Sequence, residues 1–270
     1  MAKIIAICNQ KGGTGKTTTA INLSVAVAMA GKKVMLADMD PQANATSGAG
    51  IDKHKLEKGI YEVLINNLPV KETLLEVAEN GISVLPSHPH LAGAEVELVA
   101  ILSREYRLKK AMDSIRPDFD FIFIDCPPSL GLLTINALAA ADSLIIPVQC
   151  EYYALEGLTQ LLNTINLVRN NLNSSLQIEG VLMTMADYRT NLTQEVITEV
   201  RNHFKDKVYQ AVIPRNIKLT EAPSFGKSIF NYDKDSAGAK KYLELASEVL
   251  GLDKLDINKN VQFTQNNVQN

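Results

Sequence analysis

The fold is decided by the stretch Lys11-Gly12-Gly13-Thr14-Gly15-Lys16-Thr17-Thr18, which lies two residues after the apolar run Ile4-Ile5-Ala6-Ile7-Cys8. This pattern predicts a β-strand, a glycine-rich turn and a helix that begins near Lys16. Such a turn points several backbone N–H groups and a helix N-terminus at one spot, which suits an anion such as a nucleotide phosphate. Lys16 is expected to reach the β- and γ-phosphates, and the Thr17 hydroxyl to complete a Mg²⁺ shell.

The loop departs from the standard phosphate-binding pattern in two ways. The pattern G-x-x-x-x-G-K-[ST] has glycine where this chain has Gln10, and a second lysine, Lys11, lies inside the loop. A lysine at that place is not needed to hold a phosphate within one subunit. The sequence therefore raises the question of what Lys11 contacts.

Strand-like and helical segments alternate along the chain, and several of the strands are continuously apolar. This predicts an α/β fold, a doubly wound and mostly parallel sheet with helices on both faces and ligands at the carboxyl ends of its strands. The expected strands are Lys3–Cys8, Lys33–Asp38, Ile82–Leu85, Phe119–Asp125, Ser143–Val148, Gln177–Met183 and Gln210–Ile213. The expected helices are Lys16–Ala30, Arg104–Ile115, Leu130–Ala140, Glu156–Asn171, Thr193–Phe204 and Ser236–Leu250.

Composition restricts the class of protein. The chain has 270 residues, of which 46% are hydrophobic, and no apolar run long enough for a transmembrane helix. Its three cysteines lack C-x-x-C spacing, which favours reduced, buried thiols in a cytoplasmic protein. The net charge of −3 argues against a generally basic nucleic-acid binder, although a local basic face remains open.

The pattern predicts one domain over residues 1–251 and a disordered tail over residues 252–270. No internal repeat or flexible linker divides the first part, whereas the tail is rich in Asn and Gln. Its scattered apolar residues make a poor amphipathic helix, so membrane binding is not expected.

Carboxylates follow two of the expected strands. Asp38 and Asp40 come after the second strand, where they are either turn-forming residues or groups that orient a water molecule or Mg²⁺. Asp125 ends a later apolar strand, in the arrangement of a Walker B carboxylate that holds Mg²⁺, unless it only caps a turn before two prolines.

Two further features lie near the C-terminal end. The loop that contains Pro214 and Asn216 follows a late strand, where it can wrap an adenine ring or serve only as a turn. The segment Gly180–Lys227 holds seven Lys/Arg against five acids, a weak indication of DNA binding.

Three long motifs in this order resemble the deviant Walker A ATPases of the ParA/MinD class, and most closely the chromosome-partitioning ParA proteins of the Soj type. The resemblance runs from about residue 2 to residue 250. The three motifs are Asn9–Thr19, Asp38–Gly48 and Asp125–Leu133, and two further segments, Gln149–Gly157 and Pro214–Pro223, also resemble the family. Thr14 is a departure, because the family often has an apolar residue such as valine there.

The resemblance implies a role for each site residue. Lys11 would be the signature lysine, which crosses the interface of an ATP sandwich dimer to reach the partner's nucleotide. Asp40 would position or activate the attacking water, with Asp38 beside it, and Asp125 would serve the Mg²⁺ shell. Thr17 and Thr18 would bind Mg²⁺ and phosphate.

The resemblance also implies partners. The ATP dimer of these proteins binds double-stranded DNA without sequence preference, and a ParB/Spo0J-like protein stimulates its slow ATP hydrolysis. Arg189 best matches the DNA-contacting arginine, and Arg215, Lys218 and Lys227 are further candidates. The expected location is the cytoplasm, on the nucleoid.

Three alternatives remain. A membrane-surface positioning ATPase of the MinD type would bind lipid through its C-terminal tail. An electron-transfer ATPase similar to nitrogenase iron protein would need paired cluster cysteines. A binding module with an inactive nucleotide site would lack the charged groups that are present here.

Overall fold

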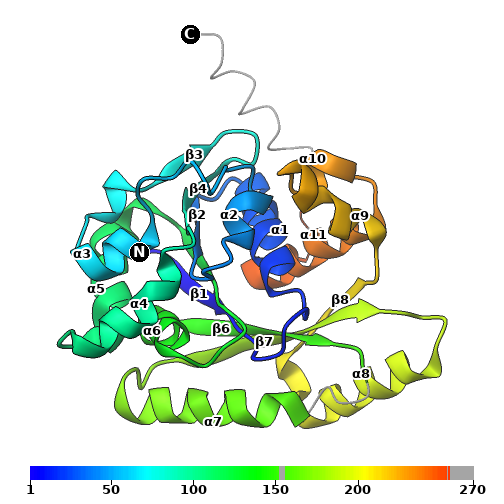
Figure 1. The fold of residues 1–270 in the computed structure, drawn as a ribbon. Coiled ribbons are helices and arrows are strands. Elements are labelled where there is room, and N and C mark those ends of the chain that lie inside the picture. The colour runs from blue at the N-terminus through cyan, green and yellow to red at the C-terminus, as the bar shows by residue number, and fades with distance from the viewer. Residues whose placement is uncertain (152–155, 254, 256–270) are drawn as a thin grey trace.

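An eight-stranded sheet runs through the computed structural model of the chain, which describes residues 1–151, 156–253 and 255 (Figure 1). The strand order is β3-β4-β2-β5-β1-β6-β7-β8, and every pair is parallel except β3 with β4. The strands are β1 (Lys3–Ile7), β2 (Val34–Asp38), β3 (Leu75–Val77), β4 (Ile82–Leu85), β5 (Phe121–Asp125), β6 (Ser143–Gln149), β7 (Gln177–Ala186) and β8 (Val208–Pro214).

Helices cover both faces of this sheet, as the sequence predicts. The α-helices are α1 (Lys16–Met29), α2 (Asn44–Gly48), α3 (Ile60–Asn66), α4 (Leu91–Glu97), α5 (Arg107–Ile115), α6 (Leu132–Ala140), α7 (Glu156–Asn171), α8 (Asn191–Phe204), α9 (Ile217–Glu221), α10 (Ile229–Asp233) and α11 (Ala237–Leu250). Short 3-10 turns lie at Val70–Glu72, Leu98–Ala100, Arg104–Tyr106, Arg116–Asp118, Lys205–Lys207 and Ala222–Phe225.

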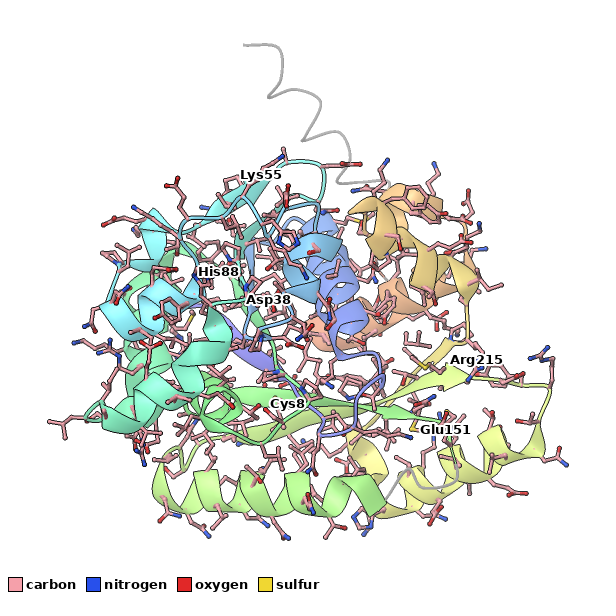
Figure 2. All side chains as sticks on the ribbon, viewed as in Figure 1. Cys8, Asp38, Lys55, His88, Glu151 and Arg215 are labelled. Atoms are coloured by element: carbon pink, nitrogen blue, oxygen red, sulfur yellow. The ribbon has the colours of Figure 1, made fainter. Side chains whose placement is uncertain are left out.

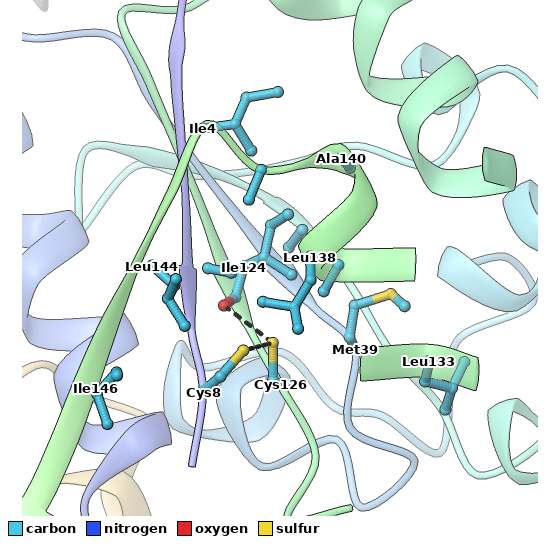
Figure 3. Packing of buried hydrophobic residues seen from close by; sticks show 14 of the residues in the cluster. Ile4, Cys8, Met39, Ile124, Cys126, Leu133, Leu138, Ala140, Leu144 and Ile146 are labelled. Carbon is cyan, nitrogen blue, oxygen red and sulfur yellow. Dashed lines mark hydrogen bonds between the residues drawn. The ribbon is translucent and has the colours of Figure 1, made fainter. Parts of the chain in front are cut away.

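The central strand β1 supplies both hydrophobic cores because successive side chains point to opposite faces. Ile5 and Ile7 pack under α1 and α11, whereas Ile4 and Cys8 enter the core on the α6 side. In that second core the Cys8 thiol donates a hydrogen bond to the Cys126 sulfur at 2.6 Å (Figure 3). All three cysteines are free and buried.

The prediction of a doubly wound, mostly parallel sheet is therefore confirmed. The sequence did not reveal β3, because this strand has three residues at the sheet edge and two of them are exposed. It also missed the short helices α2, α3, α4, α9 and α10, each of five to seven residues, in which few turns are available to display a helical period.

Most of the predicted tail over residues 252–270 lies outside the described residues. Of those that are described, Leu255 donates its backbone N–H to the Ser247 hydroxyl at 3.0 Å and so packs back on α11. Within the described part of the chain, no helix combines the length and apolar character needed to cross a membrane.

A close backbone approach joins the end of α2 to the segment before α10. Gly226 has a φ of +63°, and a Cβ there would lie 2.8 Å from the Gly50 Cα. Gly251 has a similar φ of +66°, but a Cβ there would meet nothing within 4 Å. The two glycines therefore share the same conformational strain and differ only in steric clash.

Gly226→Ala should destabilise the protein more than Gly251→Ala. Alanine in the left-handed conformation costs about 1–2 kcal/mol at either position, and the clash with Gly50 adds about 1–3 kcal/mol at Gly226 alone. Urea unfolding of both variants measures the difference. Equal losses of unfolding free energy would contradict the close approach.

Candidate functional site

The glycine loop lies between β1 and α1 at the carboxyl edge of the sheet. Gly15 adopts the left-handed conformation, with a φ of +87°, where it forms the N-cap of α1. Gly12 and Gly13 are exposed, and a Cβ on either would touch nothing. The N-cap Gly15 has no side chain to cap the first backbone N–H groups of α1, so this N-terminus suits an anion.

Lys16 is buried at the first position of α1, with a side-chain ammonium that lies against the loop. Its Nζ donates to the Lys11 carbonyl oxygen at 3.0 Å. Burial lowers the pKa of Lys16, and the carboxylates of Asp125 and Asp40 act in the opposite direction. A buried ammonium is costly unless it is paired, so the site favours a negatively charged ligand.

Lys11 lies on the outer side of the loop and is about half exposed. Its backbone N–H donates to the Asn9 side chain at 3.0 Å, and its Nζ lies 2.7 Å from a carboxylate oxygen of Glu151, just beyond β6. The two lysines therefore differ in environment: Lys16 is held inside the loop, and Lys11 faces outward.

Asp38 and Asp125 are neighbours at the ends of adjacent parallel strands. The register of β2 and β5 pairs them directly, and both are fully buried. Asp38 accepts hydrogen bonds from the Asp40 N–H at 3.0 Å and from the Thr46 N–H and hydroxyl at 2.8 and 2.7 Å. Burial nevertheless raises the pKa of Asp38 to about 6.

The Asp125 carboxylate, unlike that of Asp38, has few polar partners. Neither of its carboxylate oxygens has a hydrogen-bond partner among the described residues. Burial first, and then the charge of Asp38, raise its pKa well above the usual value, while the nearby Thr17 hydroxyl and Lys16 oppose that rise. Two unpaired buried oxygens beside a threonine hydroxyl fit a divalent cation with oxygen ligands, so the residues present are suited to Mg²⁺.

Asp40 is held at the same edge by its backbone. Its carbonyl oxygen accepts a hydrogen bond from the Ser87 hydroxyl at 2.8 Å, and its carboxylate accepts one from the Gln42 N–H at 2.9 Å. The Ser87 N–H also donates to the Thr46 hydroxyl at 2.9 Å. The segment after β4 thus fixes the position of Asp40 relative to Asp38.

A cavity of about 530 Å³ opens beside the N-terminus of α1. It is lined by Thr18 of α1, Met185 of β7, Pro214 at the end of β8, Asn216 just after it, and Tyr242 of α11. The loop predicted to wrap an adenine ring therefore borders a cavity that adjoins the phosphate loop. The volume is within the range of small-ligand sites.

Of the candidate DNA-binding residues, Arg215 lines the same cavity that Gly15 of the glycine loop borders. Arg189 follows β7 with an 85% exposed side chain and makes a bidentate contact with Asp187. This contact, with a weaker influence from Arg215, lowers the pKa of Asp187 to about 2. Lys218 pairs with Glu221 at 3.0 Å, and Lys227 lies 3.6 Å from Glu79.

Arg189 and Arg215 lie on neighbouring strand ends, since the Arg215 N–H donates to the Ala186 carbonyl oxygen at 3.0 Å. Figure 2 labels Arg215 at the end of β8, to the right of the glycine loop. The structure therefore brings these two arginines together, whereas Lys227 lies between the turn at Ala222–Phe225 and α10.

Several residues of the site were not assigned a role from the sequence. Ser87 follows the end of β4 at the carboxyl edge of the sheet, and this position after a predicted strand could have marked it as a site residue. Met185 has a φ of +53°, which is unusual for a non-glycine residue. Nothing in the sequence around Met185 predicts this conformation. Tyr242 reaches the cavity from a helix more than 200 residues after the loop, so tertiary structure alone brings it there.

Phosphate loops at the end of the first strand, backed by acidic residues on adjacent parallel strands, are typical of the P-loop nucleoside triphosphatases. The fold and the site place the chain in this class.

Comparisons with known proteins narrow the class to a family. A family model described as "AAA domain" matches residues 2–178. The chain is 58% identical over 249 residues to the sporulation initiation inhibitor protein Soj of Bacillus subtilis, covering 92% of this chain and 98% of that protein. It is 52% identical over 253 residues to the chromosome partitioning protein ParA of Myxococcus xanthus, covering 94% and 89%.

A solved structure agrees with this fold. Cobyrinic acid a,c-diamide synthase from Mycobacterium smegmatis, with bound ATP analog and magnesium, is 37% identical with a TM-score of 0.84, covering 93% of this chain and 94% of that one. The chain belongs to the ParA/Soj family of partitioning ATPases.

The raised pKa of Asp38 predicts a pH dependence of stability. A carboxyl whose pKa rises on folding contributes stability below its unfolded pKa, and that contribution is lost as the pH rises through the folded value of about 6. Between about pH 4 and pH 7 the nucleotide-free protein should lose up to about 3 kcal/mol of unfolding free energy from this group. Urea unfolding across that range should show a shallower decline for Asp38→Asn.

Asp52→Asn is the control, because Asp52 is exposed and hydrogen bonding lowers its pKa. Its unfolding free energy should follow the wild-type curve above about pH 5. An Asp38→Asn curve as steep as the wild-type curve would contradict the assignment.

Proposed function

We propose that the protein is an ATP-hydrolysing partitioning protein that binds ATP with Mg²⁺ and segregates or positions chromosomal or plasmid DNA. The buried ammonium of Lys16 and the open N-terminus of α1 suit the phosphates. The cavity bordered by Pro214 and Asn216 suits the adenine ring. Identity over nearly the whole chain is higher to the partitioning proteins than to the diamide synthase.

The residues of the carboxyl edge have distinct roles in this proposal. Gly12, Gly13, Thr14 and Gly15 cradle the phosphates through their backbone, and Thr18 adds a hydroxyl. Asp125, Thr17 and, near them, Asp38 would hold Mg²⁺, which would neutralise charge on the phosphates.

Asp40 would position or activate the attacking water in the proposed reaction. Its backbone is fixed by Ser87 and Asp38, so its carboxylate keeps a defined place at the sheet edge. Water that is held in line with the transferred phosphoryl group loses little further entropy on reaching the transition state.

The single observation that carries the proposal is the outward position of Lys11. Lys16 already occupies the inner place in the loop, while the Lys11 side chain is 45% exposed and lies on the surface of the loop. We infer that Lys11 crosses to the nucleotide of a second subunit in an ATP sandwich dimer. A cation delivered in trans makes dimerisation and phosphoryl transfer both depend on ATP, as an arginine finger does.

DNA binding and partner control complete the proposal. Arg189 and Arg215, with Lys218 and Lys227 as weaker candidates, would contact DNA phosphates without sequence preference, and pairing two subunits would raise a weak affinity through avidity. A ParB/Spo0J-like protein would stimulate the slow hydrolysis and release the dimer. The protein would act in the cytoplasm, on the nucleoid, and not on a membrane.

Lys11→Ala should keep most nucleotide affinity but lose ATP-dependent dimerisation. Lys11 lies outside the phosphate cradle of its own subunit, so the substitution should change the dissociation constant for a fluorescent ATP analogue, measured by titration, by about threefold or less. Sedimentation with a non-hydrolysable ATP analogue and Mg²⁺ should show a dimer for the wild type and a monomer for the variant.

Lys3→Ala is the matched control for this experiment. Lys3 is a similarly exposed lysine in a 2.6 Å ion pair with Glu179, but at the opposite edge of the sheet. It should dimerise like the wild type. A Lys11→Ala protein that still forms the ATP dimer would exclude the proposed role in trans.

Arg189→Ala should weaken DNA binding by the ATP dimer at every sequence. Each subunit loses one phosphate contact, so the slope of log affinity against log salt should become shallower by about two for the dimer. Fluorescence anisotropy with two unrelated duplexes at several salt concentrations measures this slope.

Lys55→Ala is the control for DNA binding, because Lys55 is equally exposed and also pairs with a nearby aspartate, Asp52. Its slope should equal that of the wild type. An unchanged slope for Arg189→Ala would remove Arg189 from the DNA-contacting residues.

A further inference from the structure

The Lys11 ammonium is held within its own subunit by Glu151. The Glu151 Oε2 lies 2.7 Å from the Lys11 Nζ, and its Oε1 accepts a hydrogen bond from the Gln149 side-chain amide at 2.5 Å. Both oxygens of this carboxylate are therefore engaged. Figure 2 labels Glu151 at the end of β6, near the glycine loop.

Lys11 is fixed at three of its polar groups in the nucleotide-free chain. Its N–H donates to the Asn9 side chain, its carbonyl oxygen accepts the Lys16 Nζ at 3.0 Å, and its own Nζ pairs with Glu151. The contact from Lys16 uses the same ammonium group that would bind the phosphates. Nucleotide entry would therefore draw Lys16 away from the Lys11 carbonyl oxygen, whereas the Lys11 side chain is held by Glu151.

We propose that Glu151 is a positioning residue for Lys11: it retains the ammonium in cis and competes with the partner subunit's nucleotide for it. This inference rests on the proposed role of Lys11 in trans. The competition sets how readily two ATP-bound subunits associate, because each dimer breaks two Lys11–Glu151 pairs. The phosphates win when bound, since their oxygens carry more negative charge than one carboxylate.

The exposure of the pair limits the size of the effect. Both side chains are 45% exposed, so water screens the attraction. Exposed ion pairs of this kind change an equilibrium by about fivefold at most, and two pairs per dimer by about 25-fold at most. The restraint is therefore weak enough for ATP to overcome and strong enough to measure.

Glu151→Gln tests the inference, because it removes the charge and keeps an oxygen that can accept from Gln149. With a non-hydrolysable ATP analogue and Mg²⁺, the dissociation constant of the dimer should fall by about 3- to 25-fold in sedimentation experiments. Raising the salt to about 1 M should shrink this difference, because salt screens an exposed pair but not a packing contact. Nucleotide affinity of the monomer should not change.

A second measurement follows Lys11 itself. Mass spectrometry after brief acylation of the nucleotide-free protein should show Lys11 reacting up to about fivefold faster in Glu151→Gln, because a paired ammonium is protected. Glu179→Gln is the control, since it breaks the 2.6 Å pair with Lys3 at the opposite edge. It should raise the reactivity of Lys3 alone and leave the dimer constant unchanged.

The outcomes separate this inference from the proposed function. If the wild type dimerises and the dissociation constant of the dimer is unchanged or higher in Glu151→Gln, the inference is overturned and the proposed function is left intact. An unchanged Lys11 reactivity also overturns it. A wild-type chain that stays monomeric with the analogue contradicts the proposed function, and the inference fails with it.

Discussion

The burial of charge at the carboxyl edge of the sheet is the constraint on which the site depends. Parallel pairing of β2 with β5 puts Asp38 and Asp125 side by side, both without solvent exposure, and Lys16 is buried in front of them. Two adjacent buried carboxylates are unfavourable, and burial raises the pKa of both. A divalent cation bound beside these carboxyl groups would favour their ionised forms.

The two lysines of the loop lie in different environments, which suits the separate roles proposed for them. Lys16 is the buried first residue of a helix that packs on the sheet, so in the proposed mechanism it contacts the phosphates of its own subunit. Lys11 is exposed and tied to Glu151, a contact that a half-solvated pair can release at little cost. In the proposed dimer, coupling between nucleotide binding and association would follow because Lys11 leaves Glu151 for the partner's nucleotide.

The proposed DNA contact of Arg189 involves a similar competition between a carboxylate and a phosphate. Arg189 is exposed, but Asp187 occupies its guanidinium, and the pKa of Asp187, lowered to about 2, keeps that carboxylate ionised at neutral pH. DNA phosphates would have to displace this contact, as the partner's nucleotide would displace Glu151 from Lys11. Weak intramolecular pairs that an anion can replace suit a protein whose binding must be reversible.

The sequence by itself determined the doubly wound sheet, the glycine loop, and the strand-end positions of Asp38 and Asp125, because these depend on local hydrophobic period and on chain order. It could not determine that Glu151 holds Lys11 or that Tyr242 lines the cavity, because these contacts join segments 140 or more residues apart. The edge strand β3 could not be predicted either, because three residues are too few to show the alternation of a strand. Only tertiary structure decided which charges are paired and which remain unpaired, because pairing depends on distance and burial, which chain order does not encode.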